Sequence, residues 1–410
     1  MSLALSTVNI ITVNPCVIPE SNPLKRDETR SKELQQSDYG DKYDYKTLCY
    51  DVFQREDKLI LSGPPLLNLN NIISDANIEI DGIEISKDCI KTSQLNRIQR
   101  NIINLSSSNK VSHLKISNDS LIFDIPITQD NCSIFKDKRV LFSKSKNNKP
   151  EWIADWINYH IVNHSIDGVL LYDNNSTDYT INELAEYLKV NILKNVDIIL
   201  IPWNFNWGLP GGSDKNLNKN IPWDSDFCQY GIMEHAKERF LSEAYGVLNL
   251  DIDELVITTK KTSIFDYLEK YNGVHIDGKW IENIPNNENG DIRFYNYFYF
   301  DKNDCKTTRK WCVSPKKIPN EHQWKIHNIA NIKLKEDSSI FHAHFRPISL
   351  SWKYDRSKSL EFNPLNHRVC YELIRNLNKI SIENPIEINK HPRLGILEKL
   401  TLNFNRIFRK

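Results

Sequence analysis

Apolar and polar residues alternate with a period of two along the first third of the chain. Between Cys49 and Asp137, short apolar runs such as Leu59-Ile60-Leu61 and Ile78-Glu79-Ile80 are separated by Asn, Asp, Ser and Gly. This pattern is typical of strands that bury one face and end in turns. It predicts a β-rich accessory domain over residues 49–137, behind a polar, poorly structured lead-in over residues 1–48.

The pattern changes near Arg139, where strand-length apolar runs alternate with segments of helical spacing. The predicted strands are 140–142, 169–172, 196–201 and 247–250, and the predicted helices are 151–164, 182–188 and 230–245. Such alternation indicates a mainly parallel sheet with helices on both faces, so we expect an α/β, Rossmann-like domain over residues 138–356. Strands are also expected at 292–300 and 340–345, and a helical C-terminal segment, with helices near 365–377 and 394–408, at 357–410.

Composition excludes several classes of function. Lys plus Arg number 53 and Asp plus Glu also number 53, so no global basic field exists to hold a nucleic acid. No apolar run reaches the about 18 to 20 residues of a membrane span. The start of the chain lacks the basic and long apolar blocks of a secretion signal. The eight cysteines are scattered singly, which favours free thiols over a zinc site, and the expected location is the reducing cytoplasm.

The end of the chain, residues 390–410, combines apolar residues with Lys and Arg at helical spacing. A basic amphipathic helix can lie on an anionic membrane surface, and it can equally pack on its own domain. The first alternative predicts peripheral contact with the inner face of the membrane.

One predicted strand runs directly into three carboxylates. Asp251, Asp253 and Glu254 follow the apolar residues 247–250. Carboxylates at a strand end can converge on one hard cation such as Mg²⁺ or Mn²⁺, which leaves coordination positions open for a substrate's phosphates. A solvated acidic turn is the alternative.

A second strand ends in Tyr172, followed by the polar residues 173–178. Such residues form turns and cap a following helix. They also lie where parallel sheets bind ligands, beyond the carboxyl ends of the strands, so Asp173 is a candidate contact for a base or ribose.

Taken together, these motifs resemble the nucleotide-sugar glycosyltransferases of the GT-A type, closest to family 92 and its bacterial family 2-like relatives. The motifs, in chain order, are Glu151-Trp152-Ile153 through His160, Gly168, the turn 172–178, Gln229, Asp251-Ile252-Asp253-Glu254 and His344-Phe345-Arg346. The resemblance spans about residues 140–352 and leaves residues 1–137 outside it.

The resemblance implies transfer of a hexose from a nucleoside diphosphate sugar, most often a UDP-sugar, to a glycan hydroxyl, with Mn²⁺ or Mg²⁺ at the Asp-x-Asp motif. In this interpretation Asp253 is the direct ligand, and Asp251 contacts the metal or the ribose. The residues that we expect to contact the donor are Ser143, Asp173, Asn174, Asp178, Gln229, Asp251 and Arg346.

The run Phe341 to Arg346 places His342, His344 and Arg346 on one face of a strand. His344 matches the family motif and is expected to complete the metal shell, and Arg346 is suited to a diphosphate oxygen. His342 is equally interpretable as a core histidine. His327, Lys316 and Lys317 are weaker candidates for metal or phosphate contacts.

The family resembles inverting enzymes, which need one general base to deprotonate the acceptor. Glu282 is the first candidate for this base and Asp277 the second, with two surface acids as the alternative interpretation. Trp280 offers a flat face to an acceptor sugar. Trp207 is a second acceptor candidate, since the long loop 203–226 contains Trp203, Trp207, Trp223 and several glycines, typical of a mobile lid or of aromatics that fill a core.

The predicted function is therefore metal-dependent glycosyl transfer in surface polysaccharide or glycoconjugate synthesis. Two alternatives stay open at this point: a metal-dependent nucleotide-sugar hydrolase or phosphotransferase, and a non-catalytic glycan-binding protein. Neither alternative requires an acceptor hydroxyl to be activated.

Overall fold

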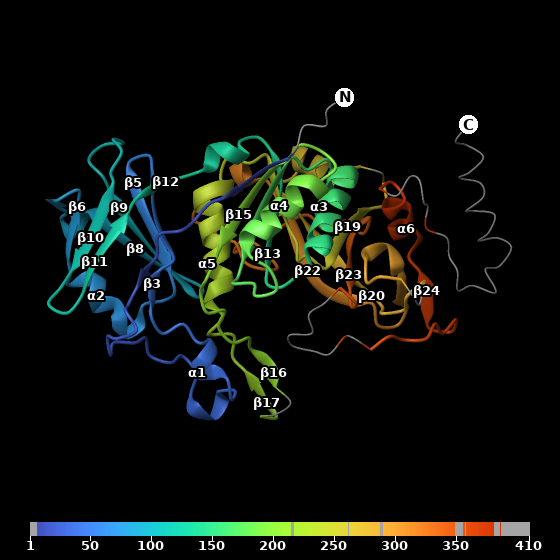
Figure 1. The fold of residues 1–410 in the computed structure, drawn as a ribbon, viewed down its shortest axis with the longest axis horizontal. Helices are drawn as coiled ribbons and strands as arrows, with labels where there is room; N and C mark the ends of the chain where they lie inside the picture. The colour runs from blue at the N-terminus through green and yellow to red at the C-terminus, as the bar shows by residue number, and fades with distance from the viewer. Residues whose placement is uncertain are drawn as a thin grey trace.

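The computed structural model describes residues 6–214, 217–260, 262–287, 290–348, 356, 358–380 and 386. A nine-stranded sheet forms its centre (Figure 1). Its strands, in spatial order, are β1 (Thr7–Ile10), β15 (Asp197–Pro202), β14 (Gly168–Asp173), β13 (Arg139–Ser145), β18 (Gly246–Asn249), β22 (Lys306–Val313), β20 (Gly273–Ile281), β23 (Ile340–Phe345) and β19 (Glu254–Thr258).

The first half of this sheet, from β1 to β18, is parallel, and β20 and β23 also pair in parallel. β22 and β19 pair with their neighbours antiparallel. The predicted α/β class with a mostly parallel sheet is confirmed.

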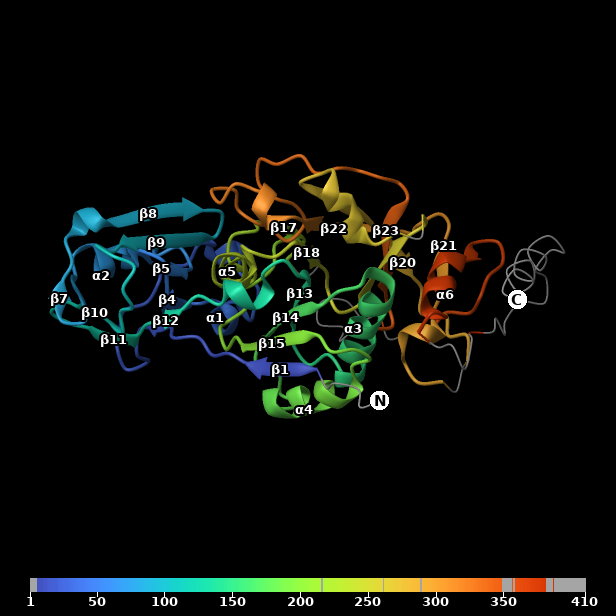
Figure 2. The same ribbon diagram turned by 90° about the horizontal axis from the view of Figure 1, so that it is seen from above.

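Helices cover both faces of the parallel half (Figure 2). They are α3 (Pro150–His164), α4 (Ile181–Asn191) and α5 (Phe227–Ala236), and α5 continues into the π-helical turn Lys237–Leu241. Leu141 and Val169 lie in one core cluster with α3 and α4, whereas Val140 and Leu170 lie in another with α5. Since alternate residues of a strand point to opposite faces, residues 140–142 of β13 and 169–171 of β14 are apolar on both faces.

Strand β13 lies at a topological switch point. The chain runs from β13 to β14 and β15 on one side and later returns to place β18 on the other side of β13. Open parallel sheets bind ligands at this point, beyond the carboxyl ends of the strands. The order of the strands thus locates the site before any side chain is considered.

The N-terminal part of the chain forms a separate β-rich lobe at one end of the molecule (Figures 1 and 2). One of its sheets contains β12 (Thr128–Gln129), β4 (Asp51–Arg55), β5 (Lys58–Gly63), β9 (Ile98–Asn104) and β8 (Ile90–Leu95). The other contains β11 (Ile122–Pro126), β10 (His113–Ser117), β6 (Asn77–Ile80) and β7 (Ile83–Glu84). The short helix α2 (Asn71–Ser74) lies between β5 and β6 in the chain. The domain boundary at residue 137 stays a prediction.

The lead-in differs from the expectation of a poorly structured segment. Its strand β1 forms the edge of the central sheet, β2 (Cys16–Val17) pairs with β3 (Thr47–Cys49), and α1 (Tyr39–Lys42) follows a buried Arg26. The guanidinium of Arg26 donates to the carbonyl oxygens of Asp44 and Thr47. A few aromatic and charged residues with buried partners therefore order a segment whose composition is polar.

The second half of the central sheet and the C-terminal part also differ from the sequence pattern. Strands β19, β20 and β22 are not predicted, and the expected strand 292–300 is a 3₁₀ turn, Phe294–Asn296, followed by β21 (Tyr299–Asp301). β21 pairs with β24 (His367–Val369), so the expected helix 365–377 is shortened to α6 (Tyr371–Leu377). The predicted basic helix near 394–408 lies outside the described residues. The loop 203–226 contains the hairpin β16 (Gly212–Asp214) and β17 (Lys219–Ile221).

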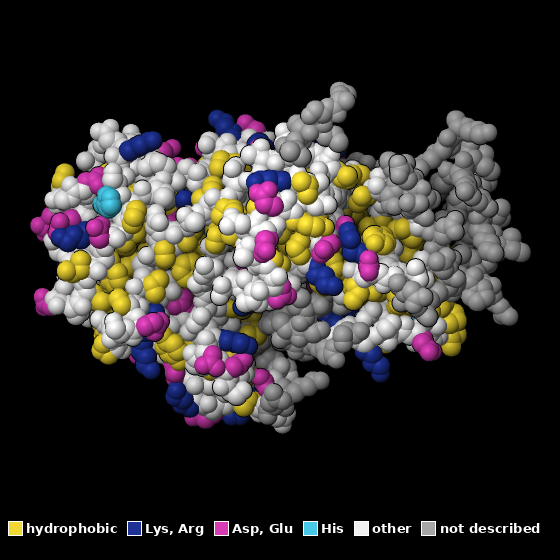
Figure 3. Space-filling view, in the orientation of Figure 1, with side chains coloured by type: hydrophobic (Ala, Val, Ile, Leu, Met, Phe, Trp, Pro, Cys, Tyr) yellow, Lys and Arg dark blue, Asp and Glu magenta, His cyan; other side chains and the backbone are white. Residues whose placement is uncertain are grey.

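Charge on the outer surface is mixed. On the face shown in Figure 3, acidic and basic side chains are interspersed, as the equal numbers of the two signs predict. The eight cysteines are free thiols. None of the helices in the described part of the chain has the length and apolar character needed to cross a bilayer.

A buried charge network joins the N-terminal lobe to α5. Arg100 of β9 contacts Glu234 and Glu238, each at 2.8 Å. Asp51 of β4 accepts from Nε2 of His235 at 2.8 Å, and the hydroxyl of Tyr172 donates to Nδ1 of the same ring at 2.7 Å. Because removal of one partner leaves a buried charge uncompensated, this network ties the lobe to the central sheet.

His164, the last residue of α3, connects this helix to β19. Its Nε2 donates to the carbonyl oxygen of Val256 at 2.9 Å, and its Nδ1 accepts from the backbone N–H of Ile264 at 3.2 Å. A protonated ring cannot accept at Nδ1. Burial lowers the pKa of His164 to about 4.

We predict that His164 makes stability depend on pH. Below pH 6.5, the usual pKa of histidine, the ring binds a proton in the unfolded chain, whereas in the folded protein it stays neutral down to about pH 4. The free energy of unfolding therefore falls with falling pH in this range, by up to about 1.4 kcal/mol per pH unit. Urea unfolding of wild type and His164→Asn from pH 7 to pH 5 measures this. The stability advantage of wild type should shrink with falling pH, and a constant difference would contradict the assignment.

Candidate active site

The predicted acidic strand end lies at the switch point. Ser143, near the end of β13, donates through Oγ to the carbonyl oxygen of Leu250 at 2.6 Å, which joins β13 to the turn after β18. Asp251 and Asp253 lie in this turn, and Glu254 begins β19. The motif is thus fixed by the backbone at the carboxyl end of a buried strand.

Asp251 is held by two ammonium groups. Nζ of Lys144 lies 2.5 Å from its Oδ1, and Nζ of Lys310, on β22, contacts its Oδ2. Burial works against ionisation, but the two lysines outweigh it and hold the pKa of Asp251 well below its usual range. The side chain is 37% exposed, so a ligand can still reach this carboxylate.

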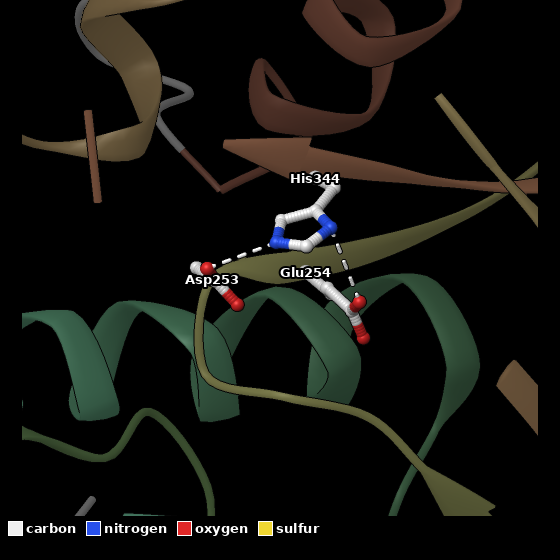
Figure 4. A group of neighbouring side chains, drawn as sticks. All are labelled: Asp253, Glu254 and His344. Atoms are coloured by element: carbon white, nitrogen blue, oxygen red, sulfur yellow. Dashed lines mark hydrogen bonds and ion pairs between the residues drawn. The ribbon is translucent and has the colours of Figure 1, made fainter. Parts of the chain in front are cut away.

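Asp253, Glu254 and His344 form a group whose potential ligand atoms lie within 4.8 Å of one another (Figure 4). Nε2 of His344 is 3.0 Å from Oδ2 of Asp253, and its Nδ1 is 3.5 Å from Oε1 of Glu254. The imidazole therefore spans two carboxylates. Burial disfavours the charged ring, but the carboxylates, Asp253 first, outweigh it and raise the pKa of His344.

This arrangement brings Asp253 and His344 together, as the sequence analysis expects, and adds Glu254. It does not bring Asp251 into the group, because both oxygens of Asp251 face lysines.

Glu254 is fully buried, and its two carboxylate oxygens have different surroundings. Its Oε2 accepts from the backbone N–H of Asp251 at 2.9 Å and lies 3.4 Å from Nζ of Lys310. Its Oε1 has no hydrogen-bond partner in the described structure, and neither has Nδ1 of His342, which lies 3.7 Å away. An unsatisfied buried carboxylate oxygen beside two imidazoles is costly unless a cation or a proton compensates it.

His342 is a core residue in this structure. It is fully buried, and its Nε2 donates to the carbonyl oxygen of Thr308 at 3.0 Å. Burial lowers the pKa of His342, which favours the neutral ring.

Strands β20 and β23 place four functional side chains in two adjacent pairs. Trp280 lies opposite His344, and the two rings stack with centroids 4.0 Å apart. Beyond the strand ends, Nε of Arg346 donates to Glu282 at 3.0 to 3.1 Å, and the guanidinium lies 4.4 Å from the Trp280 ring centre. The indole thus orients His344 and Arg346, and its contact with an acceptor sugar stays a prediction.

The two candidate bases differ in their surroundings. Glu282 is 6% exposed and paired with Arg346. Asp277 has a side chain that is 66% exposed and 3.1 Å from Nε of Arg309. Glu282 is thus joined through Arg346 to the Trp280 ring, whereas Asp277 pairs with Arg309.

The residues at the end of β14 that we expect to contact the sugar donor form hydrogen bonds within the protein. Asp173 accepts from the N–H of Ser176 at 3.0 Å and from its hydroxyl at 2.5 Å. Nδ2 of Asn174 donates to the carbonyl oxygens of Trp203 and Phe205, so Asn174 fixes the start of the long loop. Asp178 is exposed, and Gln229 is half-buried in α5. Their roles in donor binding stay predictions.

The tryptophans of the long loop separate into three environments. Trp203 is fully buried against Tyr172 and His235. Trp207 is partly buried against the same core cluster, and Trp223 is 49% exposed. The interpretation of the loop as aromatics over a core is therefore correct for Trp203.

The weaker candidates for metal or phosphate contacts form hydrogen bonds or ion pairs with other parts of the protein. Nδ1 of His327 bonds the carbonyl oxygen of Arg309 at 2.9 Å, Lys316 pairs with Asp137, and Lys317 donates to the carbonyl oxygen of Leu268 at 2.5 Å.

Sequence reasoning missed Lys144 and Lys310. Lys144 follows Ser143 just after a predicted strand, so the sequence pattern could have placed it near the site. Lys310 was not, because β22 begins with the polar run Lys306 to Arg309 and offers no apolar signal. Both lysines matter because they neutralise the first acid of the motif.

Comparison with solved structures gives partial likenesses. The mannosyltransferase Ktr4p from S. cerevisiae, in complex with GDP, is 16% identical, with a TM-score of 0.25, over 36% of this chain and 41% of that one. Core-mannan synthase A from Aspergillus fumigatus, in its Mn/GDP form, is 10% identical, with a TM-score of 0.24, over 37% and 45%. HddC from Yersinia pseudotuberculosis is 12% identical, with a TM-score of 0.27, over 50% and 92%. The chain thus spans less than half of the length of the first two.

No curated protein matches the sequence. The model of glycosyltransferase family 92 matches residues 142–365, which is more than half of the chain and contains Asp251, Asp253, Glu282 and His344. The chain belongs to glycosyltransferase family 92.

Proposed function

We propose that this glycosyltransferase moves a hexose from a nucleoside diphosphate sugar, probed first as a UDP-sugar, to a hydroxyl of a glycan, with inversion at the sugar carbon. The proposal includes a divalent cation, Mn²⁺ or Mg²⁺, held by Asp253 and His344. The observation that carries it is the 3.0 Å pair between Asp253, in the turn after β18, and His344 of β23.

The residues present fit such a cation. Two neighbouring ligands of an octahedral ion, each at about 2.1 Å, lie about 3.0 Å apart. Oδ2 of Asp253 and Nε2 of His344 are separated by 3.0 Å. Oxygen and imidazole nitrogen are also donors that Mn²⁺ accepts.

Glu254 and Trp280 both contact His344, one of the two proposed ligands. A metal-binding histidine almost always donates its other ring N–H to a carboxylate, a backbone carbonyl or water. Oε1 of Glu254 lies 3.5 Å from Nδ1 of His344, beside the hydroxyl of Thr307 at 3.4 Å. The stacked indole of Trp280 restricts rotation of the ring. Glu254 is therefore proposed as a positioning residue rather than as a third ligand.

When bound, a divalent cation stabilises the negative charge that develops on the departing diphosphate. Lys144 lies near the end of β13, and Arg346 follows β23, the strand of His344; both side chains can add charge-assisted hydrogen bonds to phosphate oxygens. Asp251, kept ionised by its lysines, remains available to a ribose hydroxyl, and Asp173 and Asn174 form the neighbouring strand end.

Glu282 is proposed as the general base. In this structure its carboxylate is paired with the guanidinium of Arg346 at 3.0 Å. If Arg346 turns to a phosphate oxygen of the donor, Glu282 is released to accept the acceptor's proton as the hydroxyl oxygen attacks and the sugar–phosphate bond breaks. Donor binding and base activation are thereby linked through one guanidinium.

The proposed setting is synthesis of a surface polysaccharide or glycoconjugate on the cytoplasmic side of a membrane. It rests on the family to which the chain belongs. Membrane contact through residues 390–410 belongs to the same proposal.

We predict that Asp253→Ala lowers Mn²⁺-dependent donor turnover by at least about 100-fold, because the charge on the leaving diphosphate loses its counter-ion. A screen of UDP- and GDP-sugars with and without glycan acceptors measures this. The matched control is Asp304→Ala, an exposed acid in the β21–β22 turn, which should retain wild-type turnover. Undiminished turnover in Asp253→Ala would remove the metal assignment.

We predict that Glu282→Gln lowers kcat by about 100- to 10,000-fold, since proton removal is lost, without raising donor KM, because Arg346 loses the carboxylate that competes with the donor. Steady-state kinetics with saturating donor measure this. A loss of the same size in Asp277→Asn, with Glu282→Gln active, would transfer the role to Asp277.

A further inference from the structure

A cavity of about 660 Å³ lies in the N-terminal lobe, outside the acidic site. One wall is formed by β8 and β9, at the outer end of the molecule in Figure 2. The other is formed by the 3₁₀ turn Leu67–Asn70 and by α2. Its volume is within the range of small-molecule sites.

The wall on β8 and β9 is a row of uncharged polar side chains. Thr92 lies opposite Asn101, and Gln94 lies opposite Gln99, so all four share one face of the strand pair. Gln99 and Asn101 are only 3% and 5% exposed. Buried amides of this kind need partners, and they find them in each other.

The four side chains are joined in a directional chain of hydrogen bonds. Nε2 of Gln94 donates to Oε1 of Gln99 at 2.5 Å, and Nε2 of Gln99 donates to Oδ1 of Asn101 at 3.5 Å. The hydroxyl of Thr92 donates to the same Oδ1 at 2.8 Å.

Each amide is thereby fixed in one orientation. Among the described residues, Nδ2 of Asn101 donates to no acceptor and Oε1 of Gln94 accepts from no donor. The row therefore offers a free donor at one end and a free acceptor at the other. A polar site that is already oriented costs a ligand little ordering entropy.

The opposite wall is mixed. Leu67, which is 44% exposed, and the half-buried Ile73 lie beside Asn70 and Ser74, and Ile90 adds an apolar side chain at the start of β8. Lys87 is the one ionisable side chain among the described residues that line the cavity, and none of them is a carboxylate, although 26% of the whole chain is charged. The lining therefore suits a neutral ligand that carries hydroxyl groups beside an apolar face, which is the chemistry of a pyranose ring.

We infer that this cavity binds a neutral glycan. The polar groups point from the face of the strand pair rather than from the free edge of β8, which favours a sugar over an added peptide strand. Its use, though not its binding, rests on the proposed function: a polymeric acceptor held at the lobe raises the effective concentration of its own chain at the acidic site.

The test is native affinity electrophoresis of the full chain in gels that contain mannan, dextran or galactan. At least one of these polysaccharides should retard wild type. Gln94→Leu, an exposed position, should weaken retardation about fivefold, the equivalent of one hydrogen bond. Asn101→Leu should abolish it. Asn77→Leu, an exposed amide on β6 of the same lobe, is the matched control and should be retarded like wild type.

Thermal unfolding of each variant identifies a loss caused by misfolding, and Gln94→Leu keeps the test valid if Asn101→Leu does not fold. Retardation by none of the three polysaccharides, or equal retardation of wild type and Gln94→Leu, would overturn the inference. Donor turnover without retardation would leave the proposed function intact, whereas retardation without turnover would leave the cavity assignment intact.

Discussion

The structure depends on compensating three carboxylates that the chain places at the end of one buried strand. Asp251, Asp253 and Glu254 follow β18 directly, and Glu254 is fully buried. Lys310, itself 1% exposed, comes from a strand distant in the sequence to contact Asp251 and Glu254. The mixed second half of the sheet is therefore as necessary to the site as the parallel half, because it carries Lys310 and His344.

The same constraint separates the roles of the acids. Two lysines take the charge of Asp251, and the imidazole of His344 bridges Asp253 and Glu254. A divalent cation at Asp253 and His344 would replace the proton of the imidazole without disturbing the lysines. In the proposed metal site, charge compensation rather than the motif spacing would select which acids bind the ion.

The parallel half of the fold could be predicted from the sequence because β13, β14, β15 and β18 are continuous apolar runs between helices of clear period. The antiparallel half could not, since β20 and β22 mix polar and apolar residues and are defined by pairing with distant strands. In the site, the motif predicts that Asp253 and His344 act together, and the structure places the two side chains 3.0 Å apart; metal binding by them stays a prediction. The stacking of Trp280 and the burial of Lys310 come from strand pairing, which has no local signal in the sequence.

The most direct test is an anomalous difference map from crystals of the protein with MnCl₂ and UDP. The account predicts one manganese peak at about 2 Å from both Oδ2 of Asp253 and Nε2 of His344, with Lys144 and Lys310 still on Asp251. A map without a peak there, or with the ion on Asp251 in place of its lysines, would contradict it.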